Sequence, residues 1–132
     1  MPTAAITYKI KPGFEEEIAE IFSAANFKRA GSPVIRDESG NEIGRITATS
    51  LFIKDDRMVR FITFEGTLED VGRHMAGQEG VQEAERKLAP FLAEPRDTST
   101  VEGFLTYFRN SSMRVLSQLS VDSLPPEILA KL

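Results

Sequence analysis

The feature that most constrains the fold is a long apolar hairpin in the middle of the chain. Two strand-like runs, Arg45–Lys54 and Arg57–Glu65, meet at the tight turn Asp55–Asp56. Both runs carry apolar residues on both faces, whereas a sheet that is wet on one side shows one polar face. A two-stranded hairpin is at best marginally stable in water. The sequence therefore predicts a larger sheet, covered on both faces.

The segments before the hairpin predict a strand, a helix and a short edge strand. Thr3–Ile10 alternates with a period of two, which is typical of a strand. Pro12 fits the first turn of a helix that extends to about Ala25, and Asn26–Ser32 is a connector. Pro33–Arg36 is predicted as an edge strand. The apolar positions of the helix form one stripe, which favours packing on a sheet: Phe14, Ile18, Ile21, Phe22 and Ala25.

The segments after the hairpin predict three helices and a last strand. Thr67 is an N-cap for a helix that runs to about Ala76. A second helix covers Val81–Leu92, and Pro90 should kink it or end it early. Thr100 caps a third, over Val101–Asn110, although part of that run also fits a strand. Ser112–Leu119 alternates and is predicted as the last strand.

This order of elements predicts a ferredoxin-like βαββαβ domain of the α+β class, with extra helices. Its antiparallel sheet has helices on one face only. We expect a second copy of the chain to cover the other face, forming a dimeric α+β barrel. The alternative is that the C-terminal segment folds back over it. The predicted domain spans residues 1–119, and residues 120–132 form a C-terminal tail.

Composition narrows the class of function. The 132 residues carry a net charge of −4 with no basic run, which argues against nucleic acid as a partner. We find no signal peptide and no apolar run of membrane-spanning length, so we expect a cytoplasmic protein without a membrane partner. There is no cysteine and one histidine, which argues against thiolate chemistry and against a metal site.

An ordered set of short segments resembles the SchA/CurD-like family. The segments are Val59–Gly66, Glu69–Met75, Gly80–Glu85, Leu88–Leu92, Pro95–Thr100 and Glu102–Phe104, followed by Phe108–Arg109 and Met113–Arg114. The resemblance implies a role in bacterial aromatic polyketide clusters, especially those for spore pigments. It also implies a fold similar to the antibiotic-biosynthesis monooxygenases, with a pocket for a polycyclic phenol. Some proteins of that group oxidise phenols with O2 and no cofactor, and others of similar fold are polyketide cyclases.

Cofactor-free oxidation of a phenol needs a base, positive charge near the developing oxyanion and a dry apolar wall. The residues that we predict to be catalytic are His74, Arg73 and Arg60, because histidine is the residue type that can serve as a base near neutral pH and the arginines can hold an anion. The residues that we predict to bind substrate are Tyr8, Phe22, Phe52 and Phe61. We predict no cofactor and no metal.

Each of these assignments has a structural alternative. His74 lies four residues after Asp70 and can bond to it on a solvated face, Arg73 can be a surface charge, and the phenylalanines can be core.

The function also has alternatives. A cyclase needs the same base and donors for an enolate, and a small dimeric barrel can bind a polyketide, or stabilise other pathway proteins, without catalysis. The chain has no Trp, which several oxygenases of the wider group place in the pocket.

Overall fold

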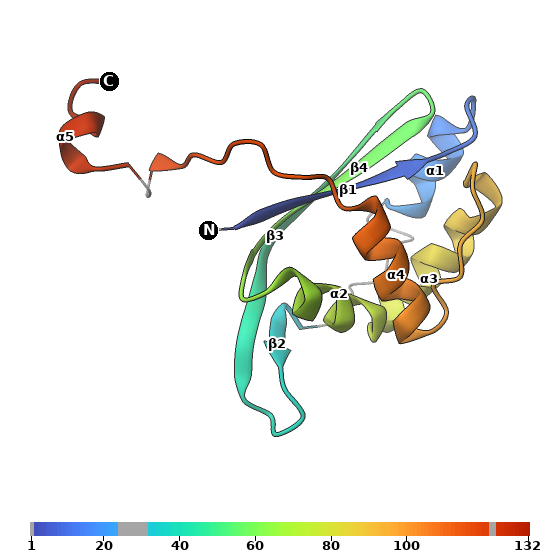
Figure 1. Cartoon of the computed structure of the whole chain (residues 1–132). Coiled ribbons are helices and arrows are strands. Elements are labelled where there is room, and N and C mark those ends of the chain that lie inside the picture. Colours follow the sequence, from blue (N-terminus) through green and yellow to red (C-terminus); the bar gives the residue numbers. More distant parts are fainter. Residues whose placement is uncertain (1, 24–31, 122–123) are drawn as a thin grey trace.

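A four-stranded antiparallel sheet is the platform of the molecule in this computed structural model (Figure 1). The structure describes residues 2–23, 32–121 and 124–132, so Ala25 and most of the predicted connector at Asn26–Ser32 lie outside the described residues. The strand order is β1-β4-β3-β2. The strands are β1 (Thr3–Lys9), β2 (Val34–Arg36), β3 (Glu42–Lys54) and β4 (Arg57–Glu65).

The predicted hairpin is formed by β3 and β4. They pair from Lys54 and Arg57 at the turn to Arg45 and Glu65 at the far end. Asp55 adopts a φ of 53°, a left-handed conformation that Asp tolerates better than most residues. A register shift between Ile46 and Ala48 exchanges the two faces of β3. A strict period of two would place Ile46 on the same face as Ala48, but because of this shift Ile46 packs on the core side.

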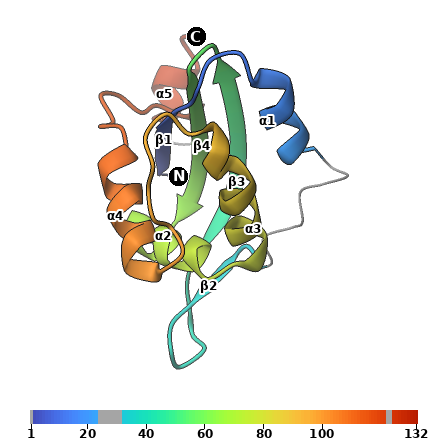
Figure 2. The same cartoon turned by 90° about the vertical axis from the view of Figure 1, so that its right-hand side faces the viewer.

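Helices cover one face of this sheet, as Figures 1 and 2 show. Thr67 and Thr100 accept hydrogen bonds from the backbone N–H groups of Asp70 (3.1 Å) and Gly103 (3.0 Å), so both predicted caps are confirmed. Pro90 ends the α-helix before it at Leu88 and starts a 3-10 turn. The elements are α1 (Glu15–Ile21), α2 (Leu68–Ala76), α3 (Glu79–Leu88), η1 (Ala89–Phe91) and α4 (Val101–Ser111).

The predicted last strand, Ser112–Leu119, was wrong. It is reduced to one isolated bridge between Ser112 and Ile6, and Met113 N donates to Ala5 O at 2.8 Å. An antiparallel partner that starts beside Ile6 can pair with only three more residues, because β1 begins at Thr3. The segment 112–119 is therefore longer than the part of β1 that is left to pair with it. Beyond Met113 it leaves the sheet (Figure 1), with Leu116 83% exposed.

The predicted fold class is confirmed: the chain has the α+β arrangement of an antiparallel sheet with helices on one face. The core lies between sheet and helices, and its largest fully buried side chains are Ile6, Ile10, Ile18, Met58, Ile62, Val71 and Phe104. The tail contains a single helical turn, α5 (Pro126–Leu129). Within the described ranges, every helix is too short or too polar to span a membrane.

Candidate functional site

A mostly apolar cavity of about 240 Å³ lies between the sheet and helices α2, α3 and α4. This volume is slightly below the roughly 300–1,000 Å³ that small-molecule sites usually have. Its wall is apolar except for a few polar groups that converge from β1, β3, β4, α3 and α4. The lining residues are Tyr8, Phe22, Ile46, Thr49, Arg60, Ile62, Met75, Val81, Ala84, Glu85, Leu88, Phe104 and Tyr107.

Arg60 is the cation of this cavity. It belongs to the helix-facing side of β4, where the strand period also places Met58 and Ile62, and it is half-buried. Its Nε donates to the Tyr8 hydroxyl (3.4 Å) and its Nη1 donates to Thr49 Oγ1 (3.2 Å). None of the ion pairs among the described residues includes Arg60. Because a half-buried charge is stabilised by an opposite charge, this guanidinium can receive an anion from a ligand.

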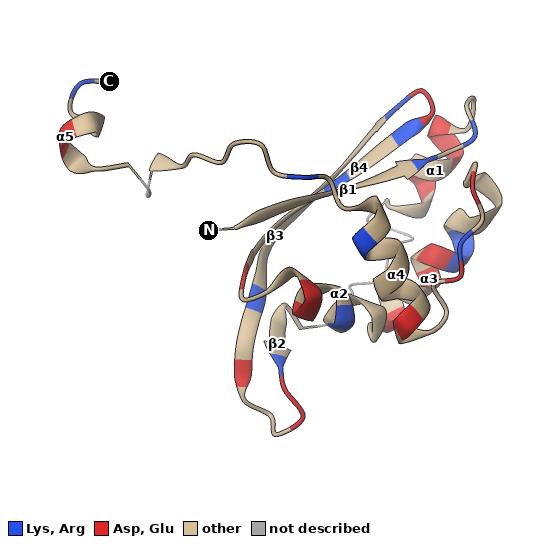
Figure 3. Ribbon diagram, viewed as in Figure 1, with Lys and Arg blue, Asp and Glu red and all other residues tan. Residues whose placement is uncertain are grey.

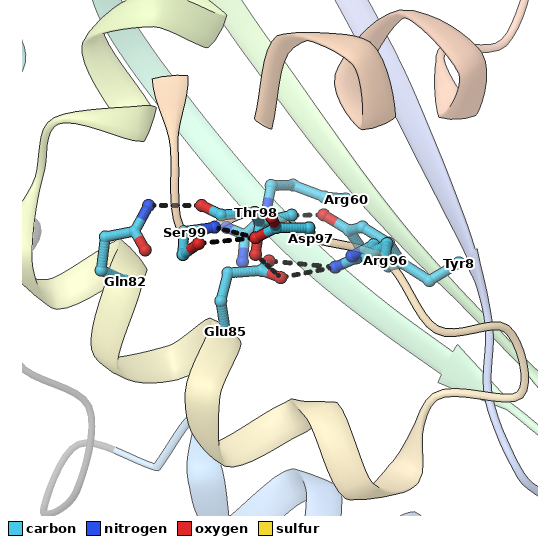
Figure 4. Close-up of polar contacts among 8 residues, drawn as sticks. All are labelled: Tyr8, Arg60, Gln82, Glu85, Arg96, Asp97, Thr98 and Ser99. Carbon is cyan, nitrogen blue, oxygen red and sulfur yellow. Dashed lines mark hydrogen bonds and ion pairs between the residues drawn. The ribbon is translucent and has the colours of Figure 1, made fainter. Parts of the chain in front are cut away.

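A second charged group is the ion pair of Glu85, which lines the cavity, and Arg96, which lies in the neighbouring groove (Figure 4). Arg96 Nη2 donates to both carboxylate oxygens of Glu85, at 3.0 and 2.9 Å. Both side chains are largely buried, with 14% and 13% of their surface exposed. Thr98 Oγ1 donates to the same carboxylate at 3.1 Å. Burial of this pair is tolerable because each charge has a partner and the carboxylate has an additional donor.

The guanidinium of Arg96 also stacks on two tyrosines. Its Cζ lies 3.7 Å from the centre of the Tyr107 ring and 4.8 Å from that of Tyr8. The two rings are stacked, with their centres 5.8 Å apart. Burial raises the pKa of Tyr107 well above its ordinary value, and the neighbouring Tyr8 raises it further. Tyr107 therefore stays protonated and uncharged.

The structure brings together three of the seven residues that the sequence singled out: Tyr8, Phe22 and Arg60 line the cavity. Arg73 is exposed and lies 3.6 Å from Glu69 and 3.5 Å from Asp70. Phe52 and Phe61 are 61% and 44% exposed, and the strand period puts them on the sheet face away from the helices.

His74 is not among the lining residues of the cavity. Its Nε2 lies 2.7 Å from the backbone oxygen of Ser32, whereas the carboxylate of Asp70 lies 3.5 Å from Arg73, so the hydrogen bonds of the described residues do not include the predicted alternative between His74 and Asp70. The ring is partly buried at the C-terminal end of α2. A catalytic role for His74 stays a prediction.

Four polar residues of the site were missed from the sequence: Glu85, Thr98, Arg96 and Tyr107. Two of these four residues could have been recognised from their positions in the sequence. Glu85 lies between Val81 and Leu88 on the apolar side of its helix, where a charge needs a partner. Tyr107 lies in an apolar stripe and carries a hydroxyl that has to be satisfied. Arg96 lies in a loop without periodicity, so only the fold could place it.

Metal ligands do not gather in the part of the chain that the structure describes: it holds no group of three His, Asp or Glu side chains placed to bind an ion. The polar groups of the cavity are instead donors and one carboxylate. This donor set suits an organic anion in an apolar setting.

Comparison with solved structures reveals a similar fold in the tetracenomycin F2 cyclase from Streptomyces glaucescens, a type-II polyketide cyclase. The TM-score is 0.55 over 92% of this chain and 99% of that chain, at 17% sequence identity. At this identity the likeness concerns the fold alone.

Sequence comparison finds relatives in Streptomyces. A 42.8 kDa protein in the whiE locus of Streptomyces coelicolor and protein SchA of Streptomyces halstedii are each 31% identical to this chain over 109 residues, or 83% of it. Polyketide synthase CurD of Streptomyces cyaneus is 30% identical over the same length. The chain spans about a quarter of the length of these relatives, since the matched part is 25–28% of each. The family model of the SchA/CurD like domain matches residues 1–121. The chain therefore belongs to the SchA/CurD-like family.

Proposed function

We propose that this chain is an aromatic polyketide tailoring protein, of the spore-pigment type, that oxidises a polycyclic phenol to a quinone with O2 and without a cofactor. The observation that carries the proposal is Arg60, a half-buried cation without a carboxylate partner among the described residues, at the wall of an apolar cavity. The family membership and the polyketide-related names of the relatives support the substrate class.

The chemistry that such a cavity supports begins with ionisation of the phenol. The phenol loses its proton to solvent water before it enters the cavity, and Arg60 and the hydroxyl of Tyr8 stabilise the bound anion. The electron-rich anion then reduces O2. In the overall reaction, a ring CH2 and O2 yield a ring C=O and water, so O2 is the oxidant and supplies the quinone oxygen. The apolar wall excludes water and strengthens the attraction between Arg60 and the anion.

A second candidate, polyketide cyclisation, is favoured by one observation: a protein of similar fold is a polyketide cyclase. Loss of a proton from carbon gives an enolate, which needs the same cation and the same donor as a phenolate. Metabolite analysis after deletion of the gene distinguishes the two candidates. A product that lacks one oxygen indicates the oxidase, whereas a product with an unclosed ring indicates the cyclase.

The direct test is aerobic incubation of the purified protein with an anthrone-like phenol. Quinone formation is followed by ultraviolet–visible absorbance, and O2 consumption by an electrode. We expect Arg60→Met to lower the rate by about 10²-fold, because it removes a charge that stabilises the oxyanion. Arg73→Met is the matched control, since it removes an exposed arginine outside the cavity. Equal rates for both variants and the parent protein would contradict the proposal. Binding of the phenol without turnover would favour the non-catalytic alternative.

We also propose that the protein is a homodimer in which a second copy covers the open face of the sheet. Residues 46–53, in the middle of β3, carry no charge, and Figure 3 shows this stretch of β3 without Lys, Arg, Asp or Glu. Phe52 and Phe61 are exposed on this face. The C-terminal segment shares a groove with Phe61, Thr3 and Ala5 but leaves both phenylalanines exposed. An apolar face of this kind is typical of an interface.

A further inference from the structure

The hydroxyl of Tyr8 accepts a hydrogen bond from the cation of the cavity. Arg60 Nε donates to it at 3.4 Å. On its other side, the ring of Tyr8 stacks on that of Tyr107, with the two ring centres 5.8 Å apart. One acceptor site of the Tyr8 oxygen is therefore taken by Arg60.

A tyrosine hydroxyl has two acceptor sites and a single donor. Because the hydroxyl accepts from Arg60, its O–H hydrogen is left to donate to a second group. Arg60 lines the cavity and not the neighbouring groove, and only 6% of the surface of Tyr8 is exposed to solvent, so the hydroxyl beside Arg60 can donate to a group inside the cavity. Hydrogen bonds that run in sequence polarise one another, which strengthens the final donor.

Arg96 packs against the ring of Tyr8 and so restricts the position of that ring. It does not line the cavity but lies in the neighbouring groove, in contact with the faces of Tyr107 and Tyr8. Glu85 holds the guanidinium from the other side (Figure 4). The Nε of Arg96 is buried and has no partner in the described part of the chain, so its carboxylate partner and the two rings hold the side chain in place.

We propose that Tyr8 is the hydrogen-bond donor to the oxyanion of the bound phenol or enolate, and that Arg96, held by Glu85, is the positioning residue that aims it. The proposal rests on the proposed function for the substrate class. In this arrangement Arg60 supplies the charge, Tyr8 supplies the directed donor, and the ring of Tyr107 stacks against that of Tyr8.

The test measures binding and not only turnover. Alizarin, a hydroxyanthraquinone whose colour changes when it ionises, serves as the probe. We expect the parent protein to bind the alizarin anion more tightly than the neutral form. Tyr8→Phe should weaken binding of the anion by about tenfold or more while binding of the neutral dye changes by less than about twofold, since a charge-assisted hydrogen bond is lost. On the anthrone substrate, the same variant should lower the rate by about 10²-fold.

The positioning role of Arg96 has its own variants. Arg96→Lys keeps the charge but loses the planar group that stacks on the two rings. Positioning predicts that Arg96→Lys weakens anion binding nearly as much as Tyr8→Phe does. A purely electrostatic role predicts that it does not. The double variant Arg96→Met with Glu85→Met removes both charges together and avoids a lone buried carboxylate, so it tests the same point in a folded protein.

The outcomes separate the two proposals. If the parent protein oxidises no phenol but its preference for the alizarin anion depends on Tyr8 and Arg96, the donor assignment holds and the oxidase assignment fails. If the protein oxidises the anthrone and Tyr8→Phe changes neither the rate nor anion binding, the donor assignment is overturned. Absence of alizarin binding to the parent protein would overturn it as well.

Discussion

The two faces of the sheet differ in which side chains they bury and which they expose to solvent. On the helix-covered face, Tyr8 is buried and Arg60 is half-buried, and the two side chains are joined by a hydrogen bond. On the open face, the aromatic residues Phe52 and Phe61 are exposed. Both sets come from the same strands, since alternate residues of a strand point to opposite faces.

This contrast teaches that apolar surface alone does not make a binding or catalytic site. The helix-covered face combines an enclosed apolar wall with charges in defined geometry, which is what a reaction that develops negative charge requires. The open face carries apolar area without directed polar groups, and this is what association requires. The following predictions test each side of the comparison, from the largest expected effect to the smallest.

Arg96→Met should destabilise the fold most. It leaves the carboxylate of Glu85 buried without its cation, which costs about 3–5 kcal/mol in comparable buried pairs. Urea unfolding followed by circular dichroism measures the free energy of unfolding. The double variant Arg96→Met with Glu85→Met should recover most of the loss. If the single variant loses less than about 1 kcal/mol, the pair is effectively solvated and the helix-covered face is less dry than the structure indicates.

Phe61→Asp tests the open face. If a second copy covers this face, the charge has to be buried in the interface, so the dimer should dissociate at micromolar concentration while the secondary structure is retained. Sedimentation velocity measures the mass. Val101→Asp is the matched control, because Val101 is also an exposed apolar residue, 45% exposed, but lies on α4. A parent protein that sediments as a monomer would show that the open face is not covered by a second copy.

Alkaline pH should destabilise the protein through Tyr107. Its pKa is raised in the folded state, whereas a tyrosine of the unfolded chain has a pKa of about 10. The stabilisation is therefore complete below about pH 10 and is lost as pH rises above it, by up to about 1.4 kcal/mol per pH unit. Urea midpoints measured over an alkaline pH series should fall more steeply for the parent protein than for Tyr107→Phe. Identical slopes would contradict the buried position of Tyr107.

His74→Ala should have the smallest effect. The variant loses the contact with the Ser32 carbonyl, which amounts to about 0.5–1.5 kcal/mol of stability for an ordinary hydrogen bond. Because His74 lies outside the cavity lining, the oxidation rate should stay within about twofold. Stopped-flow absorbance with the anthrone substrate measures it. A tenfold loss of rate, with the fold intact, would instead support the sequence prediction that His74 is the catalytic base.

Much of the fold could be predicted because local rules operate without help from distant residues. The N-caps Thr67 and Thr100, the end of α3 at Pro90 and the pairing of β3 with β4 all depend on neighbours in the sequence. The last strand could not be predicted in this way. Residues 112–119 do alternate, but a strand also needs a neighbouring strand of sufficient length. Because β1 begins at Thr3, only three of its residues lie beyond the bridge at Ile6.

The same distinction between local patterns and long-range contacts applies to the candidate site. Sequence alone determined the α+β class, the hairpin and the two-sided apolarity of the sheet, because periodicity and turn chemistry are local. It also singled out Arg60 and Tyr8 as polar residues on apolar strands. Only the tertiary structure decided that Arg96, from a loop, and Glu85, from a helix, meet behind two tyrosines. It also decided that His74 lies outside the cavity lining. The physical reason is that contacts between residues far apart in the chain depend on how the elements pack, and no local pattern encodes that packing.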